Sequence, residues 1–313
     1  MVFPLILIIS CYLKFVILII RVLVRVAFLT LFEQKVISYS QTRKGPIKVG
    51  FKGILQPFRD AIKLFMKEVT VPSLANFFVY LVSPALALGL ILRSWLVYPS
   101  SLGEGEIGLG IIFIIRCLSA GVYSLLGAGW SSNSKYALLG SLRAVAQTIS
   151  YEVRFSIILL RFVVLSSNLR LRIFIEFKGV WLGLLSVPLA LIWFISSLAE
   201  TRRTPFDFTE GESEIVSGFN TEYRAGPFAL YFLAEYGRIL FMGILFRLIF
   251  IGGVDVSVFF YIKICFVLLL FIWVRTTLPR MRYDKLINLA WVVFLPVSIS
   301  YLIFFVGLAR CLV

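Results

Sequence analysis

The chain has 313 residues, of which 60% are hydrophobic and only 15% are charged. This composition excludes a soluble globular domain and indicates a protein made mostly of membrane-embedded helices. A transmembrane β-barrel would instead show short segments of alternating hydrophobicity. Although the formal net charge is +15, we expect no nucleic-acid partner for so apolar a chain.

Long apolar segments predict an all-α integral membrane protein with a single membrane domain, residues 1–313. Each segment is long enough to cross the hydrocarbon core of a bilayer as a helix. The first lacks a small-residue cleavage site and continues past signal-peptide length, so we interpret it as a retained span. The eight predicted spans are Val2–Phe32, Val71–Val97, Ile107–Trp130, Tyr136–Leu165, Trp181–Ala199, Pro227–Ile251, Val256–Val274 and Leu286–Ala309.

A polar, basic segment at residues 34–70 separates the first two spans, and part of it has helical periodicity. Its apolar residues recur at helical spacing, whereas Arg59, Asp60, Lys63 and Lys67 face the other way. This pattern predicts an amphipathic surface helix over residues 58–68, which either lies on the membrane or covers a cavity. The predicted apolar face consists of Phe58, Ala61, Ile62, Phe65 and Met66.

Basic residues gather in the loops that follow the first, third, fifth and seventh predicted spans. The opposite loops and the C-terminal end hold only Arg170, Arg172, Lys178 and Arg310. By the positive-inside rule, the basic loops face the cytoplasm-equivalent compartment, which is the matrix in a mitochondrion.

The sequence offers no resident redox cofactor site. It contains no histidine, and its four cysteines stand alone, so no spacing suits zinc, haem or an iron–sulfur cluster. The segment Gly103–Gly108 matches G-x-G-x-x-G but follows no strand, so we interpret it as a turn between helices. We therefore expect no NAD, flavin, iron–sulfur or metal site in this chain.

An acidic loop, residues 200–226, follows the fifth predicted span and carries six of the 16 acidic residues. Carboxylates in or beside a low-dielectric medium bind protons more tightly. Glu152 and Glu235 lie within predicted spans, where ionisable groups usually face a polar interior. A row of such acids serves either as a proton relay or as structural ion pairs with nearby arginines.

Several segments carry a family resemblance. Ala199-Glu-Thr-Arg-Arg-Thr-Pro-Phe-Asp207, followed by Glu210-Gly-Glu-Ser-Glu214, resembles the loop of subunit 1 of respiratory NADH–ubiquinone oxidoreductase, complex I. The family pattern has a small polar residue where this chain has Arg202. Further similar segments are Gln41–Gly50, Gln56–Glu68, Ala128–Glu152 and Trp273–Leu286.

The resemblance implies roles for individual residues. Acids linked to proton transfer would be Glu152, Glu200, Asp207, Glu210, Glu212, Glu214, Glu222 and Glu235. Residues around or beneath the quinone channel would be Arg43, Asp60, Arg203, Arg275 and Asp284, with apolar walls from Phe58, Phe65, Phe206, Phe219 and Phe228.

The function implied is that of a membrane core subunit of complex I in the mitochondrial inner membrane, with the acidic loop on the matrix side. It would form part of the ubiquinone chamber and link quinone reduction to proton translocation, with no catalytic activity as an isolated chain. Its partners would be the other complex I subunits, ubiquinone as substrate and lipids such as cardiolipin. Alternatives are a proton or ion transporter or channel, or a purely structural membrane subunit.

The predicted spans contain a surplus of arginines. At the centre of a membrane helix each would cost about 2.5 to 3.5 kcal/mol. Some invertebrate mitochondria translate AGA and AGG as serine, which would account for the surplus; the alternative is a basic protein whose arginines bind cardiolipin or acids of its partners. The arginines concerned are Arg21, Arg25, Arg93, Arg116, Arg154, Arg161, Arg238 and Arg247, with Arg59 and Arg202 as further members of the set.

Overall fold

The structure, a computed structural model, describes residues 2–98, 107–171, 183, 186–208, 218–252 and 258–312. Every regular element in these ranges is helical, which confirms the all-α prediction. The α-helices are α1 (Val2–Ser40), α2 (Gln56–Met66), α3 (Phe77–Trp95), α4 (Gly110–Ser131), α5 (Lys135–Ser166), α8 (Val187–Glu200), α10 (Ala225–Phe246), α11 (Val258–Thr277), α12 (Tyr283–Asn288) and α13 (Leu295–Leu312). Shorter elements are the 3-10 turns η1 (Phe51–Gly53) and η2 (Gly218–Asn220) and the π-helical segments η3 (Arg247–Ile251) and η4 (Leu289–Phe294).

By length and composition, five helices within the described ranges can cross a membrane, and Val187–Glu200 is a shorter apolar helix. That all eight predicted spans cross the membrane remains a prediction. The five are Tyr12–Ser40, Phe77–Trp95, Gly110–Ser131, Val258–Thr277 and Tyr283–Cys311.

Two element boundaries follow from the positions of prolines. Helix α2 begins at Gln56, earlier than the predicted residue 58, because Pro57 fits the first helical turn, where its missing N–H is not needed. It ends at Met66 because Lys67 is extended. Near the C-terminus, the π-helical segment η4 precedes Pro296, whose ring removes a backbone donor from the helix.

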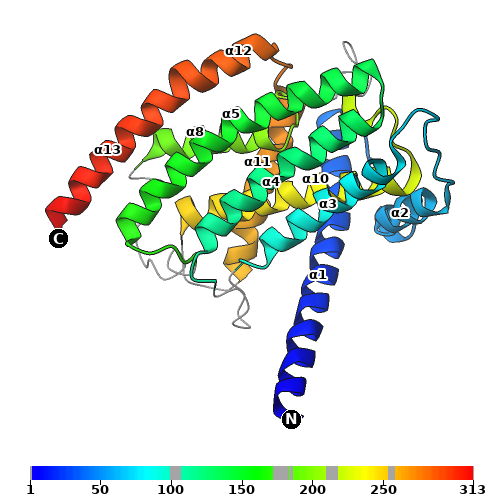
Figure 1. Ribbon diagram of the computed structural model, residues 1–313, viewed down its shortest axis with the longest axis horizontal. Helices are drawn as coiled ribbons and strands as arrows, with labels where there is room; N and C mark the ends of the chain where they lie inside the picture. The colour runs from blue at the N-terminus through cyan, green and yellow to red at the C-terminus, as the bar shows by residue number, and fades with distance from the viewer. Residues whose placement is uncertain are drawn as a thin grey trace.

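The central helices α3, α4, α5 and α10 pack side by side, as Figure 1 shows. Helix α13 runs along the outer side of α5, and the N-terminal half of α1 extends away from the bundle. Helix α2 lies beside α1 and α10. The C-terminal half of α1 also contacts the bundle through α10 and α11, so helices distant in sequence meet around α10.

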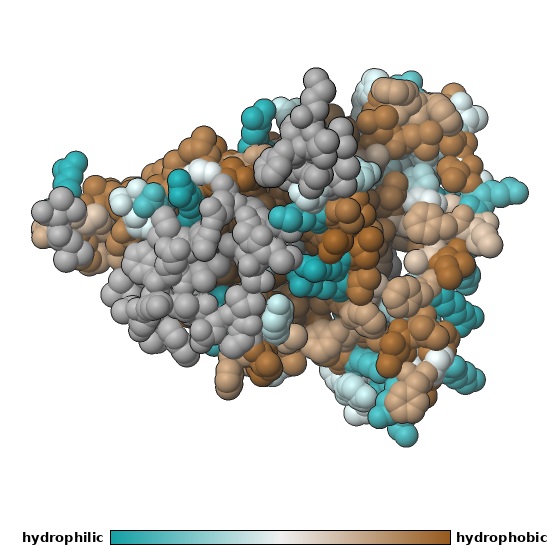
Figure 2. Space-filling view, turned by 90° about the horizontal axis from the view of Figure 1, so that it is seen from below, coloured by the Kyte–Doolittle hydropathy of each residue, from teal (hydrophilic) through white to brown (hydrophobic). Residues whose placement is uncertain are grey.

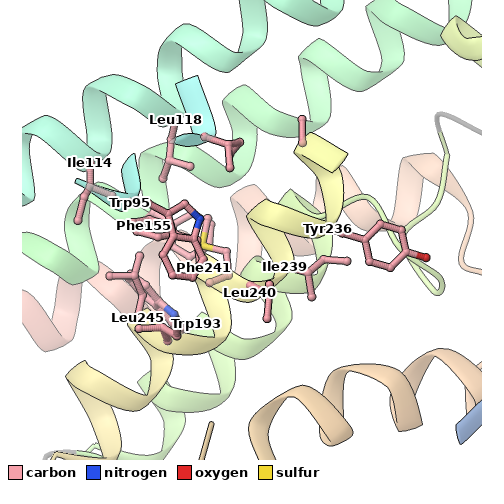
Figure 3. Packing of buried hydrophobic residues seen from close by; sticks show 14 of the residues in the cluster. Trp95, Ile114, Leu118, Phe155, Trp193, Tyr236, Ile239, Leu240, Phe241 and Leu245 are labelled. Atoms are coloured by element: carbon pink, nitrogen blue, oxygen red, sulfur yellow. The ribbon is translucent and has the colours of Figure 1, made fainter. Parts of the chain in front are cut away.

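Aromatic side chains from different helices fill the centre of the bundle (Figure 3). Phe155 of α5 packs edge to face on Trp193 of α8, with ring centroids 4.6 Å apart. Trp95 of α3 lies 5.9 Å from Phe241 of α10. All four side chains are buried. Their packing holds the helices at fixed distances from one another, and it thereby fixes the positions of the polar groups at the ends of the helices.

The outer surface is also rich in large apolar side chains, and brown hydrophobic residues form much of the described surface in Figure 2. Phe78 of α3, Tyr123 of α4 and Phe304 of α13 are all largely exposed. Water-soluble proteins rarely expose so much contiguous apolar surface. Side chains that face lipid explain it.

Candidate functional site: a buried charge cluster

The acidic loop connects α8, which ends at Glu200, to α10, which begins at Ala225. Residues 209–217 lie outside the described residues, and with them the predicted relay acids Glu210, Glu212 and Glu214. The described parts of the loop, residues 201–208 and 218–224, pack closely on the bundle.

Helix α5 holds the loop at both of its described parts. The amide of Gln147, which is fully buried, donates to the carbonyl oxygens of Ala199 at 2.8 Å and Phe206 at 2.9 Å. Farther along, Gly140 lets the backbone of Gly218 approach α5, because a Cβ at position 140 would lie only 2.7 Å from the Gly218 Cα. These contacts fix the loop ends over the acids of the helices.

A buried glutamate, Glu200, and a partly buried one, Glu235, face arginines at the start of the loop and on α10. Glu200, 3% exposed, accepts a hydrogen bond from Arg238 over 3.1 Å, and Oε2 of Glu200 has no hydrogen-bond partner among the described residues. Glu235 lies 3.7 Å from both Arg202 and Arg203. Since Glu235 and Arg238 are three residues apart on α10, they share one helix face.

A third buried acid, Glu33 near the C-terminal end of α1, forms an ion pair with Arg275 of α11. Glu33 is not among the residues predicted for the site, although it is the only acid in the first apolar helix. Together, Glu33, Glu200, Arg202, Arg203, Glu235, Arg238 and Arg275 form what we call the buried charge cluster. A cavity of about 20 Å³ lies within it, lined by Glu33, Arg203, Arg275 and Tyr236 among others, and is large enough for one water molecule.

Glu152 extends this arrangement into the bundle. It lies on α5 and accepts a hydrogen bond from the Ser119 hydroxyl of α4. Of the predicted relay acids, the structure brings Glu200 and Glu235 together, because Arg238, which pairs with Glu200, lies on the same face of α10 as Glu235.

The other described relay acids lie in the loop. Asp207 and Glu222 are both half-buried, and Asp207 has interaction partners. The main-chain carbonyl of Glu222 accepts a hydrogen bond from the Tyr80 hydroxyl over 2.8 Å. This bond joins the C-terminal part of the loop to α3.

Tyr223 anchors the same end of the loop. Its ring stacks on Tyr80 at a centroid distance of 4.3 Å, and its hydroxyl lies 3.0 Å from the hydroxyl of Ser83 and 3.3 Å from that of Ser131. Burial raises the pKa of Tyr223, only partly offset by the hydrogen bonds with Ser131 and Ser83, so the side chain is neutral at physiological pH.

Replacing Tyr223 by phenylalanine is expected to destabilise this anchor by about 1 kcal/mol, because Ser83 and Ser131 lose their shared partner. Protease cleavage of the loop in the intact membrane protein measures the effect. Tyr123→Phe on the exposed face of α4 is the control. Equal cleavage rates for the two variants would refute the anchoring role.

The predicted quinone-site residues fall into separate environments. Arg43 is exposed, and Asp60 accepts hydrogen bonds from Gln56 on its own helix at 3.0 and 3.1 Å. Asp284 pairs with Arg282 on the surface, where such pairs contribute little. Only Arg203 and Arg275 belong to the buried charge cluster.

The predicted aromatic walls also separate. Phe206 and Phe219 are buried in the core, and half-buried Phe228 stacks on Phe232 with the ring centroids 6.2 Å apart. Phe58 and Phe65 on α2 are exposed, although Phe58 meets Phe28 of α1 edge to face at 6.1 Å. Among the described side chains, these two therefore leave an apolar face of α2 open.

The carboxylates of the cluster can bind protons and exchange them, because they come from several helices and lie near one another in a site from which water is largely excluded. Within the described part of the chain, no group of three His, Cys, Asp or Glu side chains is arranged to hold a metal ion.

Comparison with known proteins gives one consistent family. The family described as NADH dehydrogenase matches residues 13–306 of the chain. NADH-ubiquinone oxidoreductase chain 1 of Anopheles gambiae is 56% identical, covering 93% of this chain and 93% of its own length. The proteins of the same name from Locusta migratoria and Oncorhynchus mykiss are 54% and 47% identical, covering 95% and 93% of this chain and 95% and 92% of their own.

Proposed function

Since this chain belongs to the family of NADH-ubiquinone oxidoreductase chain 1, we propose that it forms part of the ubiquinone chamber of complex I and links quinone reduction to proton translocation. The single observation that carries this proposal is the buried charge cluster, in which Glu33 of α1, Glu200 of α8 and Glu235 of α10 each lie close to an arginine.

In this role the acids of the cluster pass protons between the quinone chamber and the membrane. Glu200 and Glu235 take up protons near the loop, and Glu152 continues the path along α5. The loop acids Asp207, Glu210, Glu212, Glu214 and Glu222 complete the proposed relay. Arg203 and Arg275 set the charge balance of the chamber, because each is close to a buried carboxylate.

The proposed quinone entrance lies at α2. This helix contacts α1 and α10, and its apolar residues Ala61, Ile62 and Phe65 are exposed. A hydrophobic quinone tail can travel along such a face, while Arg43, Asp60 and Asp284 mark the polar surface around it. Phe206, Phe219 and Phe228 support the chamber from within the core.

The partners in this proposal are the other subunits of complex I, ubiquinone and membrane lipids such as cardiolipin. The chain spans the mitochondrial inner membrane, and its acidic loop faces the matrix. The isolated chain has no catalytic activity of its own, because electrons reach ubiquinone from cofactors on partner subunits.

A proton transporter that works alone would use the same carboxylates. The exposed apolar face of α2, together with the basic segment before it, favours the complex, because both form a platform for partner subunits. Extraction in mild detergent separates the two: a subunit stays within a very large NADH-oxidising assembly, whereas a transporter does not.

The substitution Ala61→Phe tests the quinone entrance. The added ring occupies the apolar face of α2, and we expect quinone-site inhibitors to bind about tenfold more weakly, which corresponds to about 1.4 kcal/mol. Inhibitor titration of NADH oxidation in assembled complex measures this. Lys63→Phe, which adds the same ring on the polar face, is the control. An unchanged inhibitor response in assembled Ala61→Phe would reject this entrance.

A further inference from the structure

Arginine side chains occupy the interior of the helix bundle. Arg154 and Arg161 on α5 are 0% and 1% exposed, and Arg247 at the end of α10 is 2% exposed. Arg154 donates to the Ser150 carbonyl one turn earlier, and its Nη1 has no partner among the described residues. None of the three guanidinium nitrogens of Arg161 has a hydrogen-bond partner within the described ranges.

Aromatic rings are the principal neighbours of these cations. The guanidinium carbon lies 3.7 Å from the ring centroid of Tyr151 for Arg154, 3.6 Å from Phe305 for Arg161 and 3.8 Å from Phe260 for Arg247. A desolvated cation–π contact is favourable. Arg154 and Arg161 have no carboxylate partner among the described residues, and a buried charge of this kind costs more free energy than a contact with a ring returns.

Four more arginines lie on exposed faces of apolar helices: Arg21 and Arg25 on α1, Arg93 on α3 and Arg116 on α4. Their neighbours Ile17, Ile20 and Ile112 are exposed as well, which is typical of a lipid-facing surface. At such positions a charged side chain has a high free-energy cost unless it extends to the lipid headgroups.

A serine at these positions can satisfy its own hydroxyl within the helix. In the same helices Ser94 donates to the carbonyl of Ile91, and Ser156 to that of Val153, three residues earlier in each case. Ser196 of α8 donates to the carbonyl of Ile192, four residues earlier. A serine at any helical position finds such a partner, in the core or facing lipid.

We propose that these arginines are serines in the protein that the mitochondrion makes, because it translates AGA and AGG as serine. The set comprises Arg21, Arg25, Arg93, Arg116, Arg154, Arg161, Arg238 and Arg247, with Arg59 and Arg202. The chain is 56% identical to the mosquito relative and 54% identical to the locust relative, but only 47% identical to the trout relative. This difference favours an invertebrate source, and some invertebrate mitochondria translate these codons as serine. Ten such replacements lower Lys+Arg from 31 to 21 and the net charge from +15 to +5.

One consequence deepens the proposed function and rests on it. Serine at 238 removes the cation 3.1 Å from Glu200, and serine at 202 leaves Arg203 as the cation that pairs with Glu235. A buried carboxylate without a counter-ion favours its protonated form. Glu200 would then hold the proton that a relay requires.

Peptide mass spectrometry of the complex purified from its native mitochondrial membranes tests the proposal. Trypsin is expected to cleave after Arg143, Arg203 and Arg275 but not at positions 154, 161 and 238, and chymotryptic peptides are expected to have the masses of serine there. Arginine at any of these three positions overturns the proposal, as do CGN codons in the gene. The result is independent of activity, so it is distinguishable from a failure of the proposed relay.

Discussion

Replacing Glu200 by glutamine is expected to slow ubiquinone-dependent NADH oxidation by about 10²-fold or more. Glutamine keeps the size of the side chain but cannot carry a proton, and general acid–base groups typically contribute about 10²- to 10⁴-fold. NADH oxidation with a hydrophilic artificial acceptor should be unchanged, because that acceptor takes electrons before the quinone chamber. Glu235→Gln is expected to have the same effect. NADH oxidation with ubiquinone, NADH oxidation with the artificial acceptor and proton pumping are all measured in the same membranes.

Glu68→Gln is the matched control for these variants. Glu68 is an exposed acid just after α2, outside the buried charge cluster, so its neutralisation should leave both rates and pumping unchanged. The loop variants Glu212→Gln and Glu214→Gln should resemble Glu200→Gln. If assembled Glu200→Gln and Glu235→Gln complexes oxidise NADH with ubiquinone and pump protons at normal rates, the relay assignment fails.

Replacing Arg275 by methionine is expected to destabilise the protein by about 3 to 5 kcal/mol. The substitution leaves the Glu33 carboxylate buried without its counter-ion, and loss of one partner of a buried ion pair typically costs that much. This is a large fraction of the 5–15 kcal/mol net stability of a typical domain. The amount of assembled complex and its thermal midpoint should both fall.

Two further variants separate this ion pair from general effects. The double variant Glu33→Gln with Arg275→Met should recover part of the lost stability, since no buried charge remains unpaired. Arg282→Met breaks the exposed pair with Asp284 and should change the thermal midpoint little. Equal losses for Arg275→Met and Arg282→Met would show that the Glu33–Arg275 pair has no special importance.

Local patterns in the sequence identified α2, because its apolar residues repeat at the helical period and Pro57 marks its first turn. The long apolar segments predicted apolar helices, and in the described ranges five helices are long and apolar enough to cross a membrane. The motif from Ala199 to Asp207 identified the family, which the comparisons establish. These features depend on neighbouring residues and are therefore readable from the chain itself.

Pairings between distant residues could not be read in this way. Glu33 of α1, which was not among the predicted site residues, pairs with Arg275 of α11. The Tyr223 hydroxyl meets Ser83 from 140 residues away. Nothing in the local sequence specifies such partners, because they depend on how the helices pack.

By itself, the sequence determined the helices, the family and the presence of the acids, because hydrophobic length, periodicity and motif spacing are local properties of the chain. The tertiary structure alone decided which of the described acids share a site, and that Arg154 and Arg161 lie in the core with no carboxylate partner among the described residues. The physical reason is that the energy of a charge depends on burial and on partners across helices, and the packing of α1, α5, α8, α10 and α11 sets both.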